Sequence, residues 1–197
     1  MKSVEPIRKL SDIEKIKKYL STNPRDRLLF IFGINTGLRI SDILKLKVKD
    51  VKNKRHLIVT EQKTNKIKKV LIMNDLKHEI KEYIKDKKGD TYLFESAQTN
   101  NPISRIQAYR IINNACKKKR VKGNIGTHTL RKTFGYHFYQ KTKDIALLQS
   151  IFNHSSPKIT LRYIGINQGL RSRIHRNITD CFTSFVMTCN ILIHLIT

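Results

Sequence analysis

Residues 127–139 read THTLRKTFGYHFY, and their pattern predicts a helix that begins at His128. The apolar residues of its inward stripe recur every four positions and are Leu130, Phe134 and Phe138. His128 and Arg131 stand three residues apart and share a different face of this helix. Packing does not explain a histidine and an arginine on that face. The helix therefore carries a piece of the core and two candidate functional side chains.

Start and stop signals predict three helices near the N-terminus. A capping box at residues 11–14 opens the first of them. An apolar helix over residues 27–35 stops near Gly37, because glycine favours helix ends. Ser41 caps a short third helix over residues 42–46. These segments form the first part of a mostly helical domain.

Further helices are predicted along the rest of the chain. Asn74 or Asp75 caps a helix with one apolar face. Ser104 begins another, whose inward residues are Ile106, Tyr109, Ile112 and either Cys116 or Ala115. A helix over residues 145–152 precedes a last one, which begins at Ser156 with a proline in its first turn.

Two short β-rich runs, residues 56–60 and 68–72, flank a polar turn at residues 63–66 and predict a hairpin. Residues 92–94 predict a further short piece of strand. The predicted fold class is therefore mainly α with a small antiparallel β-hairpin, an α+β arrangement. We expect one domain over residues 1–180, followed by a tail.

The charge balance indicates a polyanionic partner. The 197 residues include 40 Lys and Arg against 15 Asp and Glu, a formal net charge of +25 at pH 7. Phosphates attract such an excess and release counterions on binding, so DNA or RNA is the expected partner. An anionic membrane surface is the weaker alternative.

The cysteines and the N-terminus indicate a reducing compartment. No CxxC pair is present among Cys116, Cys181 and Cys189, so neither a disulfide framework nor a zinc knuckle is predicted. The N-terminus has no apolar segment typical of a signal peptide. We expect a cytoplasmic or nucleoid-associated protein with no metal and no cofactor.

The tail at residues 181–197 contains no Lys, Arg, Asp or Glu. Its apolar residues fall at helical spacing, which favours a helix that docks on the domain or on a neighbouring subunit. A membrane span is disfavoured because the stretch is short and Asn190 and His194 interrupt it. A disordered tail is a further alternative.

Several short motifs carry the remaining functional candidates. The chain has Gly-Leu-Arg-Ile-Ser-Asp at residues 37–42, Lys-Thr at 63–64, His-x-Leu-Arg at 128–131, Asn-His-Ser at 153–155 and Arg-Tyr at 162–163. In this order they resemble the catalytic domain of the tyrosine recombinase and phage integrase family. The resemblance covers roughly residues 4–167.

The resemblance implies an active site with Tyr163 as the nucleophile. The residues around it would be Arg39, Lys63, His128, Arg131 and His154. Asp42 would support these residues without contacting the DNA itself. It also implies a site-specific recombinase or integrase of a bacterium or phage that cleaves and rejoins DNA through a 3′-phosphotyrosine, without metal or ATP. The family's partners would be double-stranded DNA, further copies in a tetramer and an accessory DNA-bending protein. The N-terminal DNA-clamping domain of most integrases is not expected in this chain.

The chemistry of these residue types fits phosphoryl transfer. Two guanidiniums, Arg39 and Arg131, can grip the phosphate oxygens that gain charge in the reaction. A phenol is mostly protonated at neutral pH, so Tyr163 needs surrounding cations and a base, for which His128 is the candidate. His154 would donate a hydrogen bond to the phosphate. Lys63 is the candidate acid for the leaving oxygen, and Lys66 is the alternative.

Basic residues outside this group are expected to contact DNA, most of them through phosphates. They are Lys66, Lys68, Lys69, Lys117, Lys118, Lys119, Arg120, Lys132 and Arg162. Three other functions compete with recombination: a type IB topoisomerase-like nicking-closing enzyme, a DNA-binding regulator that does not cut, and a plain basic nucleic-acid binder.

Overall fold

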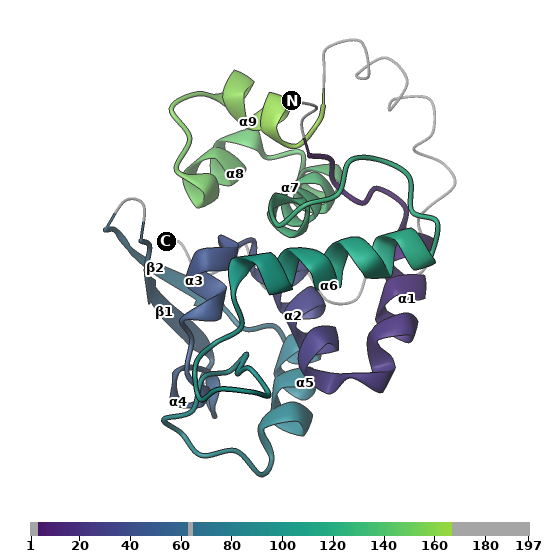
Figure 1. The fold of residues 1–197 in the computed structure, drawn as a ribbon. Helices are drawn as coiled ribbons and strands as arrows, with labels where there is room; N and C mark the ends of the chain where they lie inside the picture. Colours follow the sequence, from purple (N-terminus) through teal and green to yellow (C-terminus); the bar gives the residue numbers. More distant parts are fainter. Residues whose placement is uncertain (1–3, 63–64, 167–197) are drawn as a thin grey trace. The chain divides into compact units, whose positions relative to one another are not determined.

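The computed structural model describes residues 4–62 and 65–166 and divides the chain into two compact units, Met1–Gly165 and Ile166–Thr197. The predicted tail at residues 181–197 lies outside the described residues. The elements of the first unit, shown in Figure 1, are α1 (Leu10–Tyr19), η1 (Leu20–Thr22), α2 (Pro24–Thr36), α3 (Ile40–Leu44), α4 (Val48–Val51), β1 (His56–Thr60), β2 (Ile67–Leu71), α5 (Asn74–Ile84), α6 (Arg105–Lys118), α7 (His128–Thr142), α8 (Ile145–Phe152) and α9 (Pro157–Tyr163). The predicted fold class, mainly α with one small antiparallel hairpin, is confirmed.

The hairpin forms close to its predicted position. Strands β1 and β2 pair antiparallel, with His56 opposite Leu71 and Thr60 opposite Ile67. The Glu61 amide donates a hydrogen bond to the Lys66 carbonyl at 3.0 Å. This bond joins the two ends of the turn that connects β1 to β2. The predicted strand at residues 92–94 is wrong, since only an isolated bridge joins Tyr92 to Lys47 there.

The predicted helix ends are confirmed where a glycine or a serine hydroxyl stands at the end of the helix. Gly37 ends α2 with a left-handed φ of 60°, Ser104 caps α6, and Ser156 caps α9. The predicted capping box at residues 11–14 is wrong, because α1 begins at Leu10 without a side-chain cap. Helix α3 likewise begins after Arg39 rather than after Ser41. The four-residue helix α4 is too short to show a period in the sequence.

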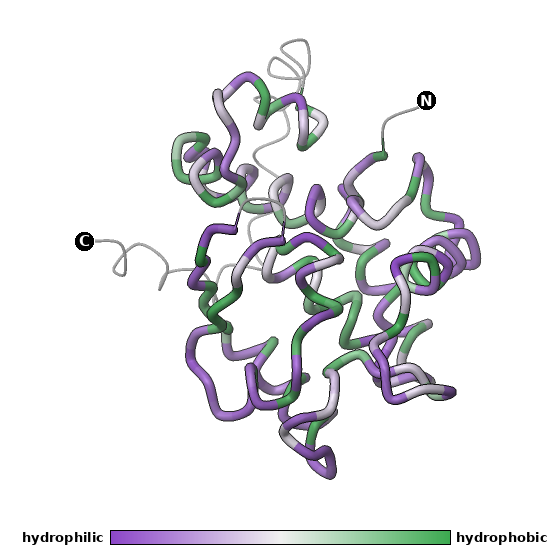
Figure 2. Tube along the Cα trace, turned by 60° about the vertical axis from the view of Figure 1, so that its left-hand side comes forward, coloured by the Kyte–Doolittle hydropathy of each residue, from purple (hydrophilic) through white to green (hydrophobic). Residues whose placement is uncertain are grey.

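The core lies around α2, whose residues from Leu28 to Gly33 are all buried. Apolar segments cluster inside the trace in Figure 2, and polar segments lie outside. The inward face of α6 agrees with the prediction at Ile112 and at Cys116 and Ala115, but not at Ile106 and Tyr109. Its buried residues are Ala108, Ile112, Ala115 and Cys116, whereas Ile106 and Tyr109 are 64% and 43% exposed. The small alanines fit against the core, and this turns the larger side chains outward.

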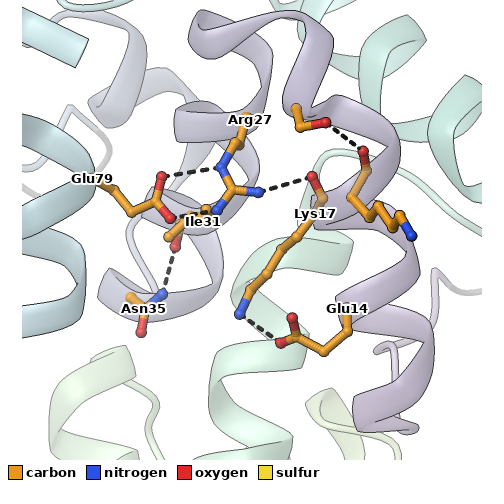
Figure 3. A network of polar contacts seen from close by, with 8 residues as sticks. Glu14, Lys17, Arg27, Ile31, Asn35 and Glu79 are labelled. Atoms are coloured by element: carbon orange, nitrogen blue, oxygen red, sulfur yellow. Dashed lines mark hydrogen bonds and ion pairs between the residues drawn. The ribbon is translucent and has the colours of Figure 1, made fainter. Parts of the chain in front are cut away.

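An ion pair joins α2 to α5. Arg27 meets the Glu79 carboxylate through Nε at 3.1 Å and through Nη2 at 2.5 Å. Its third nitrogen, Nη1, donates to the carbonyl of Lys17 in α1 at 2.9 Å (Figure 3). A bidentate arginine of this kind fixes orientation as well as distance. Arg27 of α2 thereby connects α1, α2 and α5.

Helices α7, α8 and α9 lie together at one side of α2 and α6 in Figure 1. Gly135 of α7 allows their close approach. A Cβ at this position would lie 2.6 Å from the Phe152 ring and 2.8 Å from Ile164. Aromatic and branched side chains are rigid, so moving them to make room for a Cβ costs free energy.

We expect Gly135→Ala to lower the free energy of unfolding by about 1–3 kcal/mol, although alanine is the better helix former. The matched control is Gly89→Ala, where the nearest atom to an added Cβ lies 3.6 Å away. Urea unfolding of both variants measures the difference. Equal stability of the two variants would show that α8 and α9 do not pack tightly on α7.

No helix among the described residues combines the length and the apolar character needed to cross a membrane.

Candidate active site

Arg131 occupies the buried centre of the site. It is 3% exposed and lies one turn into α7. Its Nη1 donates to the Gly37 carbonyl at 2.5 Å, and its Nη2 donates to the Phe152 carbonyl at 3.1 Å. The guanidinium also lies 4.3 Å from the centre of the Phe152 ring. Arg131 therefore joins the end of α2 to the end of α8, and a guanidinium held there keeps its charge at working pH.

Arg39 directly precedes α3 and pairs with a carboxylate at the base of the hairpin turn. Its Nη1 lies 2.7 Å from Oε2 of Glu61, whose side chain is 4% exposed. Asp42 is also buried, and its Oδ1 accepts from the Gln62 amide at 3.1 Å. Two adjacent hairpin residues are thus tied to α3, directly before the turn that would carry Lys63. Lys63 itself lies outside the described residues.

Tyr163 is the last residue of α9 and is half-buried. Its phenol oxygen lies 3.4 Å from Nδ1 of His128, the first residue of α7. Burial raises the pKa of the Tyr163 phenol above its ordinary value, and the charges of Arg131 and Arg39 oppose that rise. The phenol therefore stays protonated at neutral pH and has a histidine nitrogen within reach to take its proton.

His154 lies beside the nucleophile candidate. Its ring centre is 5.0 Å from that of Tyr163, in an edge-to-face arrangement. Burial lowers the pKa of His154, and the guanidiniums of Arg131 and Arg39 lower it further. The ring is therefore neutral at pH 7.

Two lysines predicted to contact DNA point inward instead. Lys68 donates to the Ile151 carbonyl at 2.7 Å, and burial lowers its pKa to about 8, with Arg131 acting in the same direction. Lys132 is 7% exposed, donates to the Val4 carbonyl at 2.7 Å, and lies 4.9 Å from the centre of the Tyr163 ring. A direct phosphate contact from Lys132 is not supported by this position. Both lysines add positive charge next to the candidate residues.

The other predicted DNA contacts lie on the surface. Lys119 is half-buried and stacks over the Tyr19 ring at 5.0 Å, and Lys66 lies 3.3 Å from Asn153. The exposed members of the set are Lys66, Lys69, Lys117, Lys118, Arg120 and Arg162. Their contacts with DNA remain predictions. Within the part of the chain that the structure describes, no group of three His, Cys, Asp or Glu side chains could hold a metal ion.

The structure thus brings Arg39, His128, Arg131, His154 and Tyr163 together from four separate segments, with His128 and Arg131 both on α7. The chain also matches the model of the phage integrase family over residues 8–169. It belongs to this family. As a member it is a tyrosine recombinase, which agrees with the resemblance and the enzyme class predicted from the motifs.

Individual relatives support this assignment. The probable integrase/recombinase YoeC of Bacillus subtilis is 62% identical over 169 residues, which cover 85% of this chain and 93% of that protein. The tyrosine recombinase XerA of Pyrococcus furiosus is 31% identical over 158 residues, which cover 76% of this chain and 54% of XerA. This recombinase chain therefore spans nearly all of the first relative and about half of the second.

Solved recombinase structures have the same fold. A crystal structure of XerA recombinase superposes with a TM-score of 0.73 at 21% identity, covering 89% of this chain and 66% of that one. A lambda integrase dimer bound to a COC′ core site gives 0.66 at 20% identity, covering 85% and 62%. At these identities the likeness shows the fold alone.

Sequence reasoning missed two polar residues of this recombinase site. Glu61 meets Arg39, and its only signal was an acidic residue just before a lysine-rich turn. Thr160 contacts His154, and its signal was a threonine one helical turn before Tyr163. Neither signal identifies a role by itself, because both contacts depend on tertiary structure.

We expect Glu61→Gln to lower the free energy of unfolding by about 2 kcal/mol. The change leaves the Arg39 guanidinium, whose side chain is 18% exposed, beside a neutral amide. Urea unfolding measures the loss. The control is Glu14→Gln, which removes a carboxylate that pairs with Lys17 but is 66% exposed, so little change is expected there. An unchanged stability for Glu61→Gln would mean that the ion pair does not help to hold the hairpin.

Proposed function

We propose that this chain cleaves and rejoins DNA through a covalent 3′-phosphotyrosine on Tyr163. The observation that carries the proposal is the placement of one phenol within 3.4 Å of a histidine nitrogen and beside two arginines. The arginines come from positions 39 and 131, far apart in the sequence. A surface tyrosine with a packing role has no need of such neighbours.

In the proposed reaction the Tyr163 oxygen attacks a backbone phosphorus atom. A new phosphorus–oxygen bond to tyrosine forms, and the bond to the 5′-oxygen breaks. The phenol proton passes to His128, and Lys63 donates a proton to the leaving 5′-oxygen. Arg39 and Arg131 stabilise the charge on the other phosphate oxygens. The energy of the broken ester stays in the new ester, so rejoining is the same reaction reversed and needs no ATP.

DNA binding is supported by charge and by relatives. The net charge of +25 favours a polyanion. Structural neighbours include XerH recombinase bound to its difH substrate and lambda integrase bound to a core site. By analogy we expect this chain to act as a tetramer on double-stranded DNA in a bacterial cytoplasm, with an accessory DNA-bending protein as a further partner.

A type IB topoisomerase-like enzyme is the second candidate, because it would use the same nucleophile and cations. The two activities differ in their products. A recombinase joins an end from one duplex to another at a defined site, whereas the topoisomerase-like enzyme relaxes supercoiled plasmid of any sequence.

The experiment uses short nicked duplexes with a random-sequence segment. Cleavage on the nicked strand, a short distance 5′ of the nick, releases a small fragment with the leaving 5′-hydroxyl, so the strand cannot be rejoined and the covalent intermediate is trapped. We expect a denaturant-resistant protein–DNA species whose recovered DNA converges on one sequence. Trapping with no sequence preference, together with plasmid relaxation, would favour the topoisomerase-like enzyme. DNA binding with no trapped species would favour the regulator.

A further inference from the structure

Glu61 is a buried carboxylate in contact with one of the two arginines of the site. Its side chain is 4% exposed, and its Oε2 lies 2.7 Å from Nη1 of Arg39. Among the described residues, no other carboxylate lies within ion-pair distance of Arg39. The angles of the contact fall outside those of a hydrogen bond, so the pair is held by charge. A neutral side chain of the same size therefore cannot replace Glu61.

The backbone of Glu61 belongs to the hairpin turn. Its amide donates to the Lys66 carbonyl at 3.0 Å, and its carbonyl accepts from the Asn65 amide at 2.8 Å. The next residue, Gln62, donates its amide to Oδ1 of Asp42 in α3 at 3.1 Å. The place of the Glu61 carboxylate is therefore fixed by the base of the turn and by α3.

Glu61 also lies among the other cations of the site. Burial lowers the pKa of Lys68 to about 8, the Arg131 charge acts in the same direction, and the Glu61 charge opposes both. Burial lowers the pKa of Arg131 as well, and the Glu61 charge again acts in the opposite direction. One carboxylate thus offsets part of the mutual repulsion of Arg39, Arg131 and Lys68. Without it, that repulsion favours other orientations of the Arg39 side chain.

We propose that Glu61 is a positioning residue, which holds the Arg39 guanidinium in the orientation that grips the scissile phosphate. The inference rests on the proposed function for its consequence, because it is the cleavage reaction that needs Arg39 in one orientation. A guanidinium has five N–H donors, so a contact through Nη1 leaves others for the phosphate oxygens. An arginine that is oriented in advance does not have to be ordered during the reaction, which lowers the barrier.

Positioning and simple charge neutralisation predict different results for Glu61→Gln, which keeps the size and the backbone contacts. The substitution removes a negative charge from a site for a polyanion, so DNA binding should stay equal or become tighter. If Glu61 only reduced the positive charge, cleavage would also stay equal or become faster. If Glu61 positions Arg39, we expect single-turnover cleavage at saturating DNA to be about 10–100-fold slower, although binding does not weaken.

A double-mutant cycle with Arg39→Lys shows whether Glu61 acts through Arg39. Lysine keeps the charge at this position, but an ammonium group is a point charge with no plane to orient. In the Arg39→Lys background we therefore expect Glu61→Gln to change the cleavage rate by less than about 3-fold. Slowing by the same factor in both backgrounds would show that Glu61 acts independently of the guanidinium, and would overturn the proposal.

Glu79→Gln is the matched control for the loss of an ion pair. Glu79 of α5 meets Arg27 of α2, with Nε of the arginine 3.1 Å from a carboxylate oxygen (Figure 3). Both substitutions break a carboxylate–arginine pair between two elements, and both should shift the urea unfolding curve to lower urea. Glu79→Gln should nevertheless cleave like the wild type. All rates are measured at a temperature where circular dichroism shows each variant to be folded.

A folded Glu61→Gln protein that cleaves at the wild-type rate would overturn the proposal, and so would equal slowing by Glu79→Gln. If Glu61→Gln does not fold, Glu61→Asp takes its place, because it keeps the charge but draws the carboxylate back by one methylene. We expect it to slow cleavage by about 3–10-fold, and to have no such effect in the Arg39→Lys background. A wild-type protein that never forms a trapped species would contradict the proposed function itself, whereas these variant results contradict the positioning role alone.

Discussion

Tyr163→Phe is expected to abolish covalent attachment to DNA while leaving the fold and DNA binding unchanged. The substitution removes one oxygen, which lies 3.4 Å from Nδ1 of His128. The ring keeps its edge-to-face contacts with His154 and Phe152. We therefore expect a loss of trapped species of at least about 10³-fold, with stability changed by less than about 0.5 kcal/mol.

The measurement combines trapping on nicked duplexes with a DNA-binding titration. Tyr19→Phe is the matched control, because it removes a phenol oxygen from α1 and keeps the ring that Lys119 contacts. It should trap DNA like the wild type. If Tyr163→Phe still forms a denaturant-resistant species, another residue is the nucleophile and the proposed reaction is wrong.

Arg131→Lys is expected to damage both stability and cleavage. The guanidinium donates to the Gly37 and Phe152 carbonyls at once, through two nitrogens in a fixed plane. An ammonium group has the charge but not the planar fork, so it cannot reproduce both contacts. We expect the free energy of unfolding to fall by about 2–3 kcal/mol and single-turnover cleavage by at least about 100-fold.

Urea unfolding and single-turnover trapping measure the two effects separately. Arg110→Lys, on the exposed side of α6, is the control for the substitution itself and should leave the unfolding curve in place. A folded Arg131→Lys protein that cleaves at the wild-type rate would show that the planar guanidinium is not needed. If Arg131→Lys lowers the free energy of unfolding but leaves the cleavage rate unchanged, Arg131 has a structural role only.

The sequence predicted what local rules determine. The hairpin followed from β-rich runs around a polar turn, and the ends of α2, α6 and α9 followed from Gly37, Ser104 and Ser156. The association of Arg39, His128, Arg131, His154 and Tyr163 was inferred from motif order, since no local rule gives distances between residues so far apart in the chain. The structure supplies those distances.

What the sequence could not predict depends on packing between elements. A lysine-rich segment looks uniformly exposed, yet Lys68 and Lys132 reach backbone carbonyls inside the domain. On α6 the prediction of Ile112 and of Cys116 or Ala115 as inward is confirmed, but that of Ile106 and Tyr109 is wrong, because the small Ala108 packs on the core in their place. Glu61 and Thr160 have a role only in relation to Arg39 and His154, so neither stands out alone.

Mass spectrometry of the trapped protein–DNA species tests the account most directly, because it identifies the bond itself. After nuclease and trypsin digestion, the peptide that begins at Tyr163 and ends at Arg171 is predicted to carry a nucleotide joined through its 3′-phosphate to the phenol oxygen. Attachment at any other residue, or through a 5′-phosphate, would contradict the arrangement of one tyrosine, two histidines and two arginines as the site of strand cleavage.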